Sequence, residues 1–144
     1  MKIGFIGPKN TNFSLDEIAE FQKELTKIIV VNVRDFRFYF CEKTPFSEKV
    51  YKIIRPVTAV NLTSEYITAV THEPTEENYL QTVLTAEYVY PPLKYVPEKH
   101  LKAKIMQWMA DEMDVLFFFA RKNKAVIKCL DYAKTLPDKK LFVF

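Results

Sequence analysis

Two unbroken apolar runs near the ends of the chain are its clearest structural pattern. Residues 2–7 and 113–119 are almost entirely apolar, and each run is followed by polar residues and then by apolar positions at helical spacing. Strands of a parallel sheet have this pattern because helices cover both of their faces. A helix expected at 123–136 then leads to a third apolar run, 140–144. Both ends of the chain therefore predict β-α-β units.

Capping residues and prolines mark the expected helix ends. Ser14 and Glu17 have the spacing of a capping box at the start of the first helix. Pro45 opens a second helix, which we expect to end at Pro56, and Pro97 opens another helix directly before the second apolar run. Helices therefore alternate with strands along the chain.

The middle of the chain gives weaker patterns. β-branched or alternating residues predict strands or hairpin arms at 28–33 (continued or paired through 36–40), 57–62, 65–71 and 86–90. A helix is expected at 75–86, directly before the last of these strands. The order of elements predicts an α/β fold, a single-domain, Rossmann-like, doubly wound and mostly parallel sheet with helices on both faces. A length of 144 residues suits one domain, 1–144.

Composition narrows the function classes only a little. The formal charge of +3, from 21 basic and 18 acidic residues, is too balanced to indicate nucleic-acid binding. Cys41 and Cys129 lie far apart in the sequence and predict reduced, buried thiols, and His72 and His100 have no partner at metal-ligand spacing. No apolar run reaches bilayer-spanning length and no secretion signal is recognisable, so we expect a cytoplasmic protein without membrane, metal or cofactor.

Two loops are the expected binding site. In an open α/β sheet the ligand lies at the carboxyl ends of the strands, so the loops after the two apolar runs are candidates for the floor of a pocket. Glycine permits close backbone approach, helix amino termini attract anions, and basic side chains supply charge. The candidate ligand-binding residues are Gly7, Lys9, Asn10 and Thr11 in the first loop and Arg121 and Asn123 in the second, with Lys122 as further charge.

A purely structural interpretation of the same residues stays open. Gly7 and Pro8 also suit a tight turn, Asn123 suits a helix cap, and the lysines suit a solvated surface. The chain has only two glycines and lacks both a Walker loop and a G-x-G-x-x-G fingerprint.

Carboxylates provide the candidates for catalysis. Glu73, beside His72, and Asp114, beside Asp111 and Glu112, are the candidate general bases, although acidic residues at such places more often form turns. Arg34, Asp35 and Arg37 follow the strand expected at 28–33, where doubly wound folds often bind a ribose or base. They equally suit a charged hairpin.

Two segments resemble known families. Met1 to Lys9 resembles the opening of the Rossmann-like nucleotide-binding proteins grouped with the DNA-processing protein A and lysine-decarboxylase-like families. Residues 110–119, then 125–133 and the closing strand, are similar to the last β-α-β unit of those families and of the nucleoside deoxyribosyltransferases. The deoxyribosyltransferases place a nucleophilic glutamate four residues before the alanine of a Tyr-Ala pair. Here the pair is Tyr132-Ala133 and the corresponding residue is Cys129.

These observations lead to three hypotheses. The first is a protein that binds a nucleotide-like or other phosphorylated small molecule and acts as a sensor, carrier or degenerate enzyme. The second is a non-enzymatic interaction scaffold, such as a viral or mobile-element accessory protein. The third is a nucleotide hydrolase or N-glycosidase. A homodimer is also expected, since many doubly wound domains pair through a helix or an edge strand.

Overall fold

A computed structural model of the chain describes residues 1–31, 35–42, 44–60, 64–69, 87–89, 91–93 and 96–144. Six strands form one sheet in the order β4-β3-β2-β1-β5-β6. The strands are β1 (Lys2–Ile6), β2 (Arg37–Cys41), β3 (Glu65–Ala69), β4 (Glu87–Val89), β5 (Val115–Phe118) and β6 (Lys140–Val143), and the helices are α1 (Leu15–Val31), α2 (Pro45–Thr58), α4 (Glu98–Glu112) and α5 (Lys124–Lys134). Every strand pair is parallel. The predicted α/β, Rossmann-like, doubly wound fold is confirmed.

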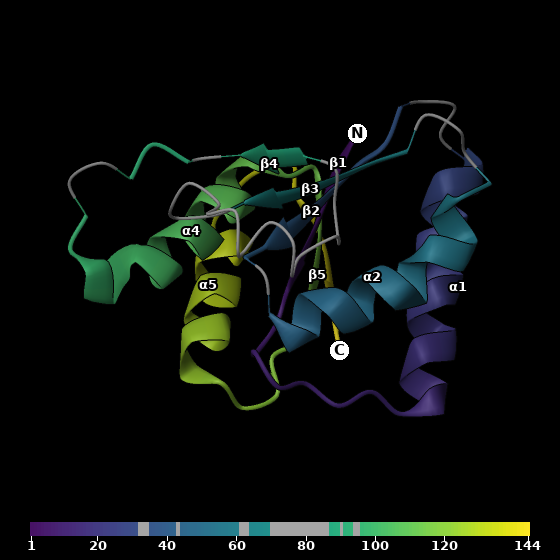
Figure 1. Cartoon of the computed structure of the whole chain (residues 1–144), viewed down its shortest axis with the longest axis horizontal. Coiled ribbons are helices and arrows are strands. Elements are labelled where there is room, and N and C mark those ends of the chain that lie inside the picture. Colours follow the sequence, from purple (N-terminus) through teal and green to yellow (C-terminus); the bar gives the residue numbers. More distant parts are fainter. Residues whose placement is uncertain (32–34, 43, 61–63, 70–86, 90, 94–95) are drawn as a thin grey trace.

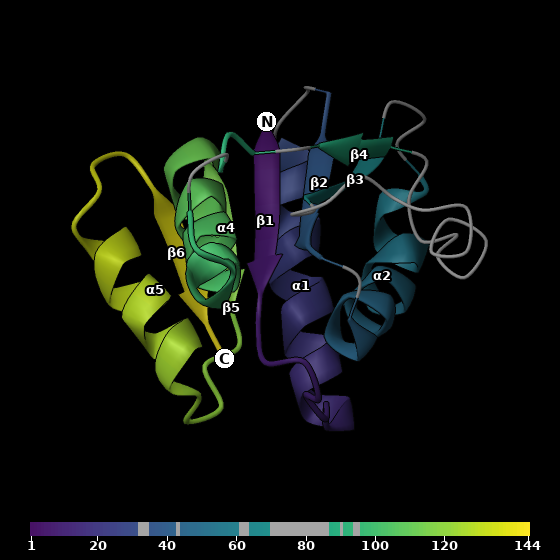
Figure 2. The same cartoon turned by 60° about the vertical axis from the view of Figure 1, so that its left-hand side comes forward.

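Helices cover both faces of the sheet, as Figures 1 and 2 show. Side chains alternate along each strand, so Ile3 and Phe5 of β1 pack in the core under α1 and α2. Ile6 packs in the second core, under α4 and α5. Gly4 faces the same way as Ile6, and a Cβ there would lie 2.7 Å from Cγ of Met113, which follows α4. Two separate cores therefore hold the central strands from either side.

Phenylalanine dominates the core beneath α1 and α2. One row crosses four neighbouring strands at the same level, and consecutive ring centroids lie 5.4, 5.6 and 4.7 Å apart: Phe40, Phe5, Phe117 and Phe142. The register pairs these residues directly across β2, β1, β5 and β6. Burial contributes about 1.5–3 kcal/mol for each of the three fully buried rings, Phe5, Phe40 and Phe117, and less for the partly buried Phe142. The row fixes the register of the strands that lead into the two loops.

The prediction of a strand at 28–33 is wrong for residues 28–31, which are helical; residues 32 and 33 lie outside the described part of the chain. α1 continues through Val31 because Ile28 is buried on the same stripe as Phe21 and Leu25. The cost of β-branched residues in a helix is a fraction of a kcal/mol each, and burial of Ile28 outweighs it. The strand that follows is Arg37–Cys41, which agrees with the expectation for 36–40.

The second helix also runs further than expected. It passes through Pro56 and ends at Thr58, and the N–H of Ala59 donates to the Arg55 carbonyl at 3.0 Å. The prediction of a strand or hairpin arm at 57–62 is therefore wrong for residues 57–60, which form the end of α2 and a turn; residues 61 and 62 are not described. β3 pairs in parallel on both sides, so it is not a hairpin arm.

The remaining elements agree with the predicted order. β4 lies within the strand expected at 86–90, and α4, β5, α5 and β6 follow as expected. The helix expected at 75–86 lies outside the described residues. In the described part of the chain, no helix is long and apolar enough to cross a bilayer.

Candidate functional site

The loops after β1 and β5 start side by side. β1 and β5 are parallel neighbours with Ile6 opposite Phe118, and the N–H of Phe119 donates to the Ile6 carbonyl at 2.9 Å. From β1 the chain passes through α1 to β2 on one side, whereas from β5 it passes through α5 to β6 on the other. The strand order therefore reverses between β1 and β5, and ligands of open α/β sheets bind at such a switch point.

A shallow pocket of about 440 Å³ opens between the two loops. It is lined by Pro8, Asn10, Thr11 and Asn12 of the first loop and by Arg121, Lys122 and Asn123 of the second. Four of the six predicted ligand-binding residues are thus brought together: Asn10, Thr11, Arg121 and Asn123. Gly7 and Lys9 are not among the described lining residues.

Gly7 has a packing role. A Cβ at this position would lie 2.4 Å from a ring carbon of Phe46, in the first turn of α2. Phe46 is 2% exposed and forms a cluster with Phe13 and Phe119, whose ring centroids lie 6.1 and 5.6 Å from its own. The close approach that the glycine permits is therefore to Phe46, where the sequence had suggested a ligand.

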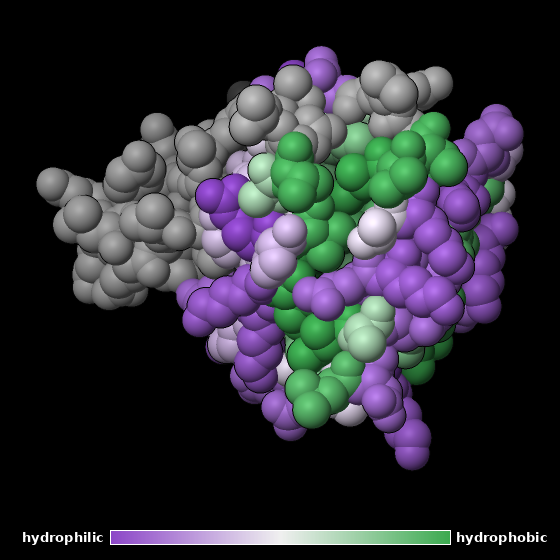
Figure 3. All heavy atoms as spheres, turned by 90° about the vertical axis from the view of Figure 1, so that its right-hand side faces the viewer, coloured by the Kyte–Doolittle hydropathy of each residue, from purple (hydrophilic) through white to green (hydrophobic). Residues whose placement is uncertain are grey.

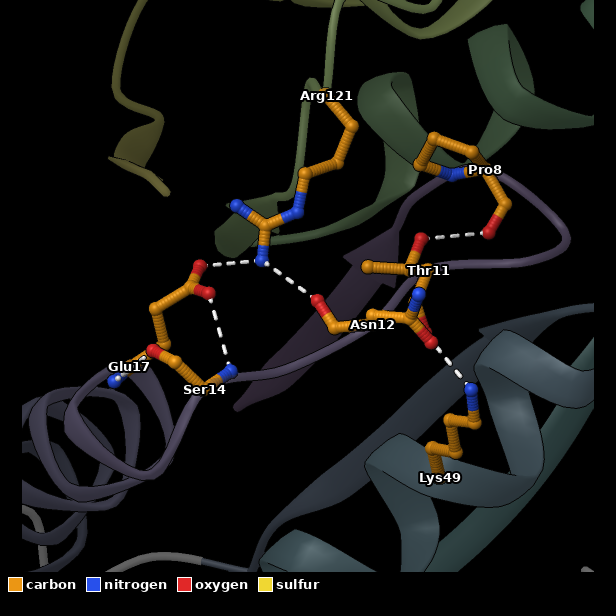
Figure 4. A network of polar contacts seen from close by, with 7 residues as sticks. All are labelled: Pro8, Thr11, Asn12, Ser14, Glu17, Lys49 and Arg121. Atoms are coloured by element: carbon orange, nitrogen blue, oxygen red, sulfur yellow. Dashed lines mark hydrogen bonds and ion pairs between the residues drawn. The ribbon is translucent and has the colours of Figure 1, made fainter.

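Thr11 and its neighbours hold the first loop in shape (Figure 4). The buried Thr11 hydroxyl donates to the Pro8 carbonyl at 2.7 Å, and Lys49 Nζ of α2 donates to the Thr11 carbonyl at 2.9 Å. The Phe46 N–H donates to the Lys9 carbonyl at 3.0 Å. Lys49 is a residue that sequence reasoning missed, because no local pattern links position 49 to a loop 38 residues earlier.

Arg121 joins the second loop to the first, as Figure 4 shows. One guanidinium nitrogen contacts the Glu17 carboxylate and donates to the Asn12 carbonyl at 3.3 Å. The same group lies 5.9 and 5.8 Å from the ring centroids of Phe13 and Phe119. Arg121 therefore connects the two loops that line the pocket, and Glu17 matches much of its charge.

Glu17 also completes the predicted capping box of α1. Its N–H donates to Ser14 Oγ at 3.1 Å and its carboxylate accepts from the Ser14 N–H at 3.2 Å. Burial acts to raise the pKa of Glu17, but the hydrogen bonds from Arg121 and Ser14 outweigh it and hold the pKa below its ordinary value. The carboxylate is thus ionised at neutral pH and keeps both contacts.

The second loop is a tight turn of unusual conformation. Arg121 and Lys122 have φ of 50° and 59°, and the Asn123 N–H donates to the Ala120 carbonyl at 2.9 Å. Positive φ at both central residues is the pattern of a type I′ turn, which normally uses glycine or asparagine. Each non-glycine residue held there costs about 1–2 kcal/mol.

The amino end of α5, which carries the partial positive charge of the helix dipole, lies beside the pocket. Asn123 caps this helix, with its Oδ1 accepting from the Val126 N–H at 3.1 Å, as the structural interpretation of this residue expected. The first turn of α5 contains no acidic residue, whereas that of α1 contains Asp16 and Glu17. Because an acidic side chain would offset the positive end of the helix dipole, the amino end of α5 keeps its attraction for an anion.

The carboxylate candidates lie elsewhere. Asp114 precedes β5 at the amino edge of the sheet, opposite the pocket, and its carboxylate accepts from the Lys2 N–H at 2.8 Å. That position gives Asp114 a structural role and no access to the pocket. Glu73 and His72 lie outside the described residues, as does Arg34. Because β2 begins at Arg37, the predicted ribose site falls at the amino edge of the sheet, where Arg37 pairs with Glu65 at 3.0 Å.

The described lining of the pocket offers hydrogen-bonding groups and positive charge. Its described lining consists of amides, one hydroxyl, one proline and two cations, with no carboxylate, imidazole or thiol for proton transfer. The described residues contain no group of three side chains able to hold a metal ion. Comparison with known protein families and with curated protein sequences found no match.

Proposed function

We propose that the protein binds a small phosphorylated ligand, such as a nucleotide or a phosphorylated metabolite, between the loops after β1 and β5, and acts as a sensor, carrier or degenerate enzyme. The position of the pocket is the observation that supports this most. It lies at the switch point of a doubly wound sheet, where such folds bind their ligands. Its volume of about 440 Å³ is within the range of small-molecule sites.

Charge and hydrogen-bonding groups favour a phosphate. Lys122 lines the pocket next to the amino end of α5, and Asn10 and Asn12 offer side-chain amides from the opposite loop. Backbone strain at Arg121 and Lys122 also supports a functional site, because strained turns concentrate where a binding geometry must be held.

A thermal-shift screen tests the proposal. Nucleotides, cyclic oligonucleotides and sugar phosphates are added to the intact protein, and a ligand at 100 times its dissociation constant stabilises the native state by about 2.7 kcal/mol. For a chain of this length that shift is about 9 °C in melting temperature.

Two variants locate the ligand. Lys122→Gln and Asn10→Ala, both at exposed positions, should abolish or reduce the shift without changing the melting temperature of the free protein by more than a few degrees. Lys23→Gln, on the exposed side of α1, is the matched charge control. The absence of a shift with every ligand, or an equal shift in all variants, would refute the proposal. Product formation in the same mixtures would instead support the hydrolase hypothesis.

A second candidate function is self-association as an interaction scaffold. Large apolar side chains are exposed where α1 and α2 end, with Val30 at 73%, Val31 at 77% and Val60 at 78%. Figure 3 shows apolar surface among hydrophilic side chains on this side of the molecule. Sedimentation velocity should show a dimer that Val30→Asp and Val31→Asp convert to a monomer, and a monomeric parent protein would contradict this role.

A further inference from the structure

A second cavity lies between α4 and α5, on the face of the sheet opposite α1 and α2. It has a volume of about 600 Å³ and is formed by one side of α4 and one side of α5. Figure 2 shows the two helices side by side. The described lining residues are His100, Ala103, Lys104 and Gln107 of α4 and Lys124, Ala125, Lys128, Cys129 and Tyr132 of α5. We call this cavity the α4/α5 groove.

The floor and sides of the α4/α5 groove have different chemistry. Ala103 and Ala125 leave the space open because neither has a side chain beyond Cβ, and Cys129 and the Tyr132 ring add apolar surface. Burial, with a smaller contribution from Asp111, raises the pKa of Cys129 to about 12, so the thiol is neutral at physiological pH. The floor is therefore apolar.

The edges of the groove are cationic. Three of its described lining residues are lysines, and His100 lies at one end. None of the described lining residues is acidic. Lys104 Nζ donates to Gln107 Oε1 at 3.2 Å, and this partner is neutral. Asp111, beyond the opposite end, accepts a hydrogen bond from the Tyr132 hydroxyl.

The two helices give the groove a direction. The strands are all parallel, so α4 and α5 each return the chain from the carboxyl edge of the sheet to its amino edge, and both helices have their amino ends toward the carboxyl edge. Lys124 occupies the first turn of α5, where a positive side chain opposes the helix dipole and is unfavourable by itself. An anion bound there would interact favourably with both the Lys124 ammonium and the positive end of the helix dipole. Gln107 and Tyr132 lie toward the other end, where the Tyr132 hydroxyl donates to Asp111.

The dimensions favour a small molecule. The lining residues span seven steps of α4 and eight of α5, or roughly 10–12 Å at 1.5 Å per residue. A stable protein interface normally uses about 20–30 residues a side, more than twice the nine described residues here. The volume also lies within the usual range for small-molecule sites.

From this geometry we propose that the α4/α5 groove binds a small amphipathic anion, with its carboxylate or equivalent acid group near Lys124 and Lys128 and its apolar part along Ala103, Ala125 and the Tyr132 ring. The α4/α5 groove is separate from the pocket between the loops after β1 and β5, and this proposal does not depend on the function proposed for that pocket. The two lie on either side of the amino end of α5, and no described residue lines both.

Decanoate is a suitable probe, and calorimetric titration of the intact protein measures its dissociation constant. Decanol and decylamine have the same chain with a neutral or positive head. We expect decanoate to bind at least tenfold more tightly than either, because only its head gains from the lysines. Equal binding of all three, or no binding of decanoate, would overturn the proposal.

Two kinds of variant locate the probe. Lys124→Gln with Lys128→Gln should weaken decanoate binding about tenfold or more, whereas Lys23→Gln with Lys52→Gln, on helices of the opposite face, should leave it unchanged. Ala125→Trp should fill the groove and abolish binding, and Ala19→Trp, at an exposed position of α1, is its control. Urea denaturation checks that each variant is folded. Decanoate binding that survives Ala125→Trp in a folded protein, or that inorganic phosphate displaces, would refute the assignment.

Discussion

Replacement of Gly7 by alanine separates two explanations of this glycine. If Gly7 exists so that a ligand can approach the backbone, Gly7→Ala should weaken binding and leave the stability of the free protein unchanged. If it exists because Phe46 packs against it, the free protein should lose stability. The added Cβ would lie 2.4, 2.6 and 2.9 Å from three ring carbons of Phe46, whereas carbon atoms pack best at about 3.5–4.0 Å.

The expected magnitude follows from how firmly Phe46 is held. The ring is 2% exposed and contacts Phe13 and Phe119, so a shift away from the new Cβ would disturb its packing in the core. Overpacking of this kind costs about 1–3 kcal/mol. Gly7 does not have a positive φ, so alanine brings no backbone strain, and its lower entropy in the unfolded chain returns about 0.4–1 kcal/mol. We expect a net loss of about 1–2 kcal/mol, or roughly 3–7 °C in melting temperature.

A double-mutant cycle in urea denaturation measures the contact directly. In a Phe46→Leu background the smaller side chain leaves room for the Cβ, so Gly7→Ala should cost at least 1 kcal/mol less than in the parent protein. Gly4→Ala is the matched comparison. Its Cβ would meet Met113, Leu116 and Met109 at 2.7, 3.1 and 3.1 Å, and the flexible methionines can adjust, so its cost should be smaller. A Gly7→Ala protein as stable as its parent, or additive costs in the cycle, would refute the packing explanation.

Three further predictions concern the loops and the thiols. Glu17→Gln should destabilise the protein at neutral pH, as measured by urea denaturation. The folded state holds the pKa of Glu17 below 4.5, so its ionised carboxylate stabilises the protein above that pH. The difference between variant and parent should therefore shrink below pH 4.5 and vanish once the carboxylate of the folded protein is protonated. Lys122→Gly should raise the free energy of unfolding by about 0.5–1 kcal/mol relative to Lys122→Ala, since glycine adopts positive φ without strain, and equal stabilities would show that the turn is unstrained. Burial raises the pKa of both Cys41 and Cys129, so both thiols should stay neutral at mildly alkaline pH and react with a thiol reagent much more slowly in the folded protein than in urea, and equal labelling rates in the two states would contradict the raised pKa values.

The fold was largely predictable because its strongest patterns are local. A strand buried on both faces must be apolar throughout, and residues 2–7 and 113–119 show this with no knowledge of the rest of the chain. The parallel pairing of β1 with β5 follows from the doubly wound order, and the structure confirms it.

The predictions that failed depended on contacts from other parts of the chain. Residues 28–31 have strand propensity, but the α1 stripe buries Ile28 and keeps them helical. Pro56 is a plausible helix end, yet α2 continues to Thr58, which is fully buried and whose hydroxyl hydrogen-bonds to that of Tyr66 in β3. Propensity is a weak preference, and burial of a few side chains is enough to reverse it.

The candidate site was predictable in position but less so in the roles of its residues. Arg121 and Glu17 are 104 positions apart, so the sequence presents the arginine as free charge when its guanidinium is already matched by a carboxylate. The attraction of the pocket for an anion therefore comes from Lys122 and the amino end of α5. An anion that recruited Arg121 would have to displace Glu17 and leave a half-buried carboxylate without its partner, which is unfavourable. For the ligand we propose, we therefore expect the phosphate to contact Lys122 and the loop amides while the Arg121–Glu17 contact stays closed.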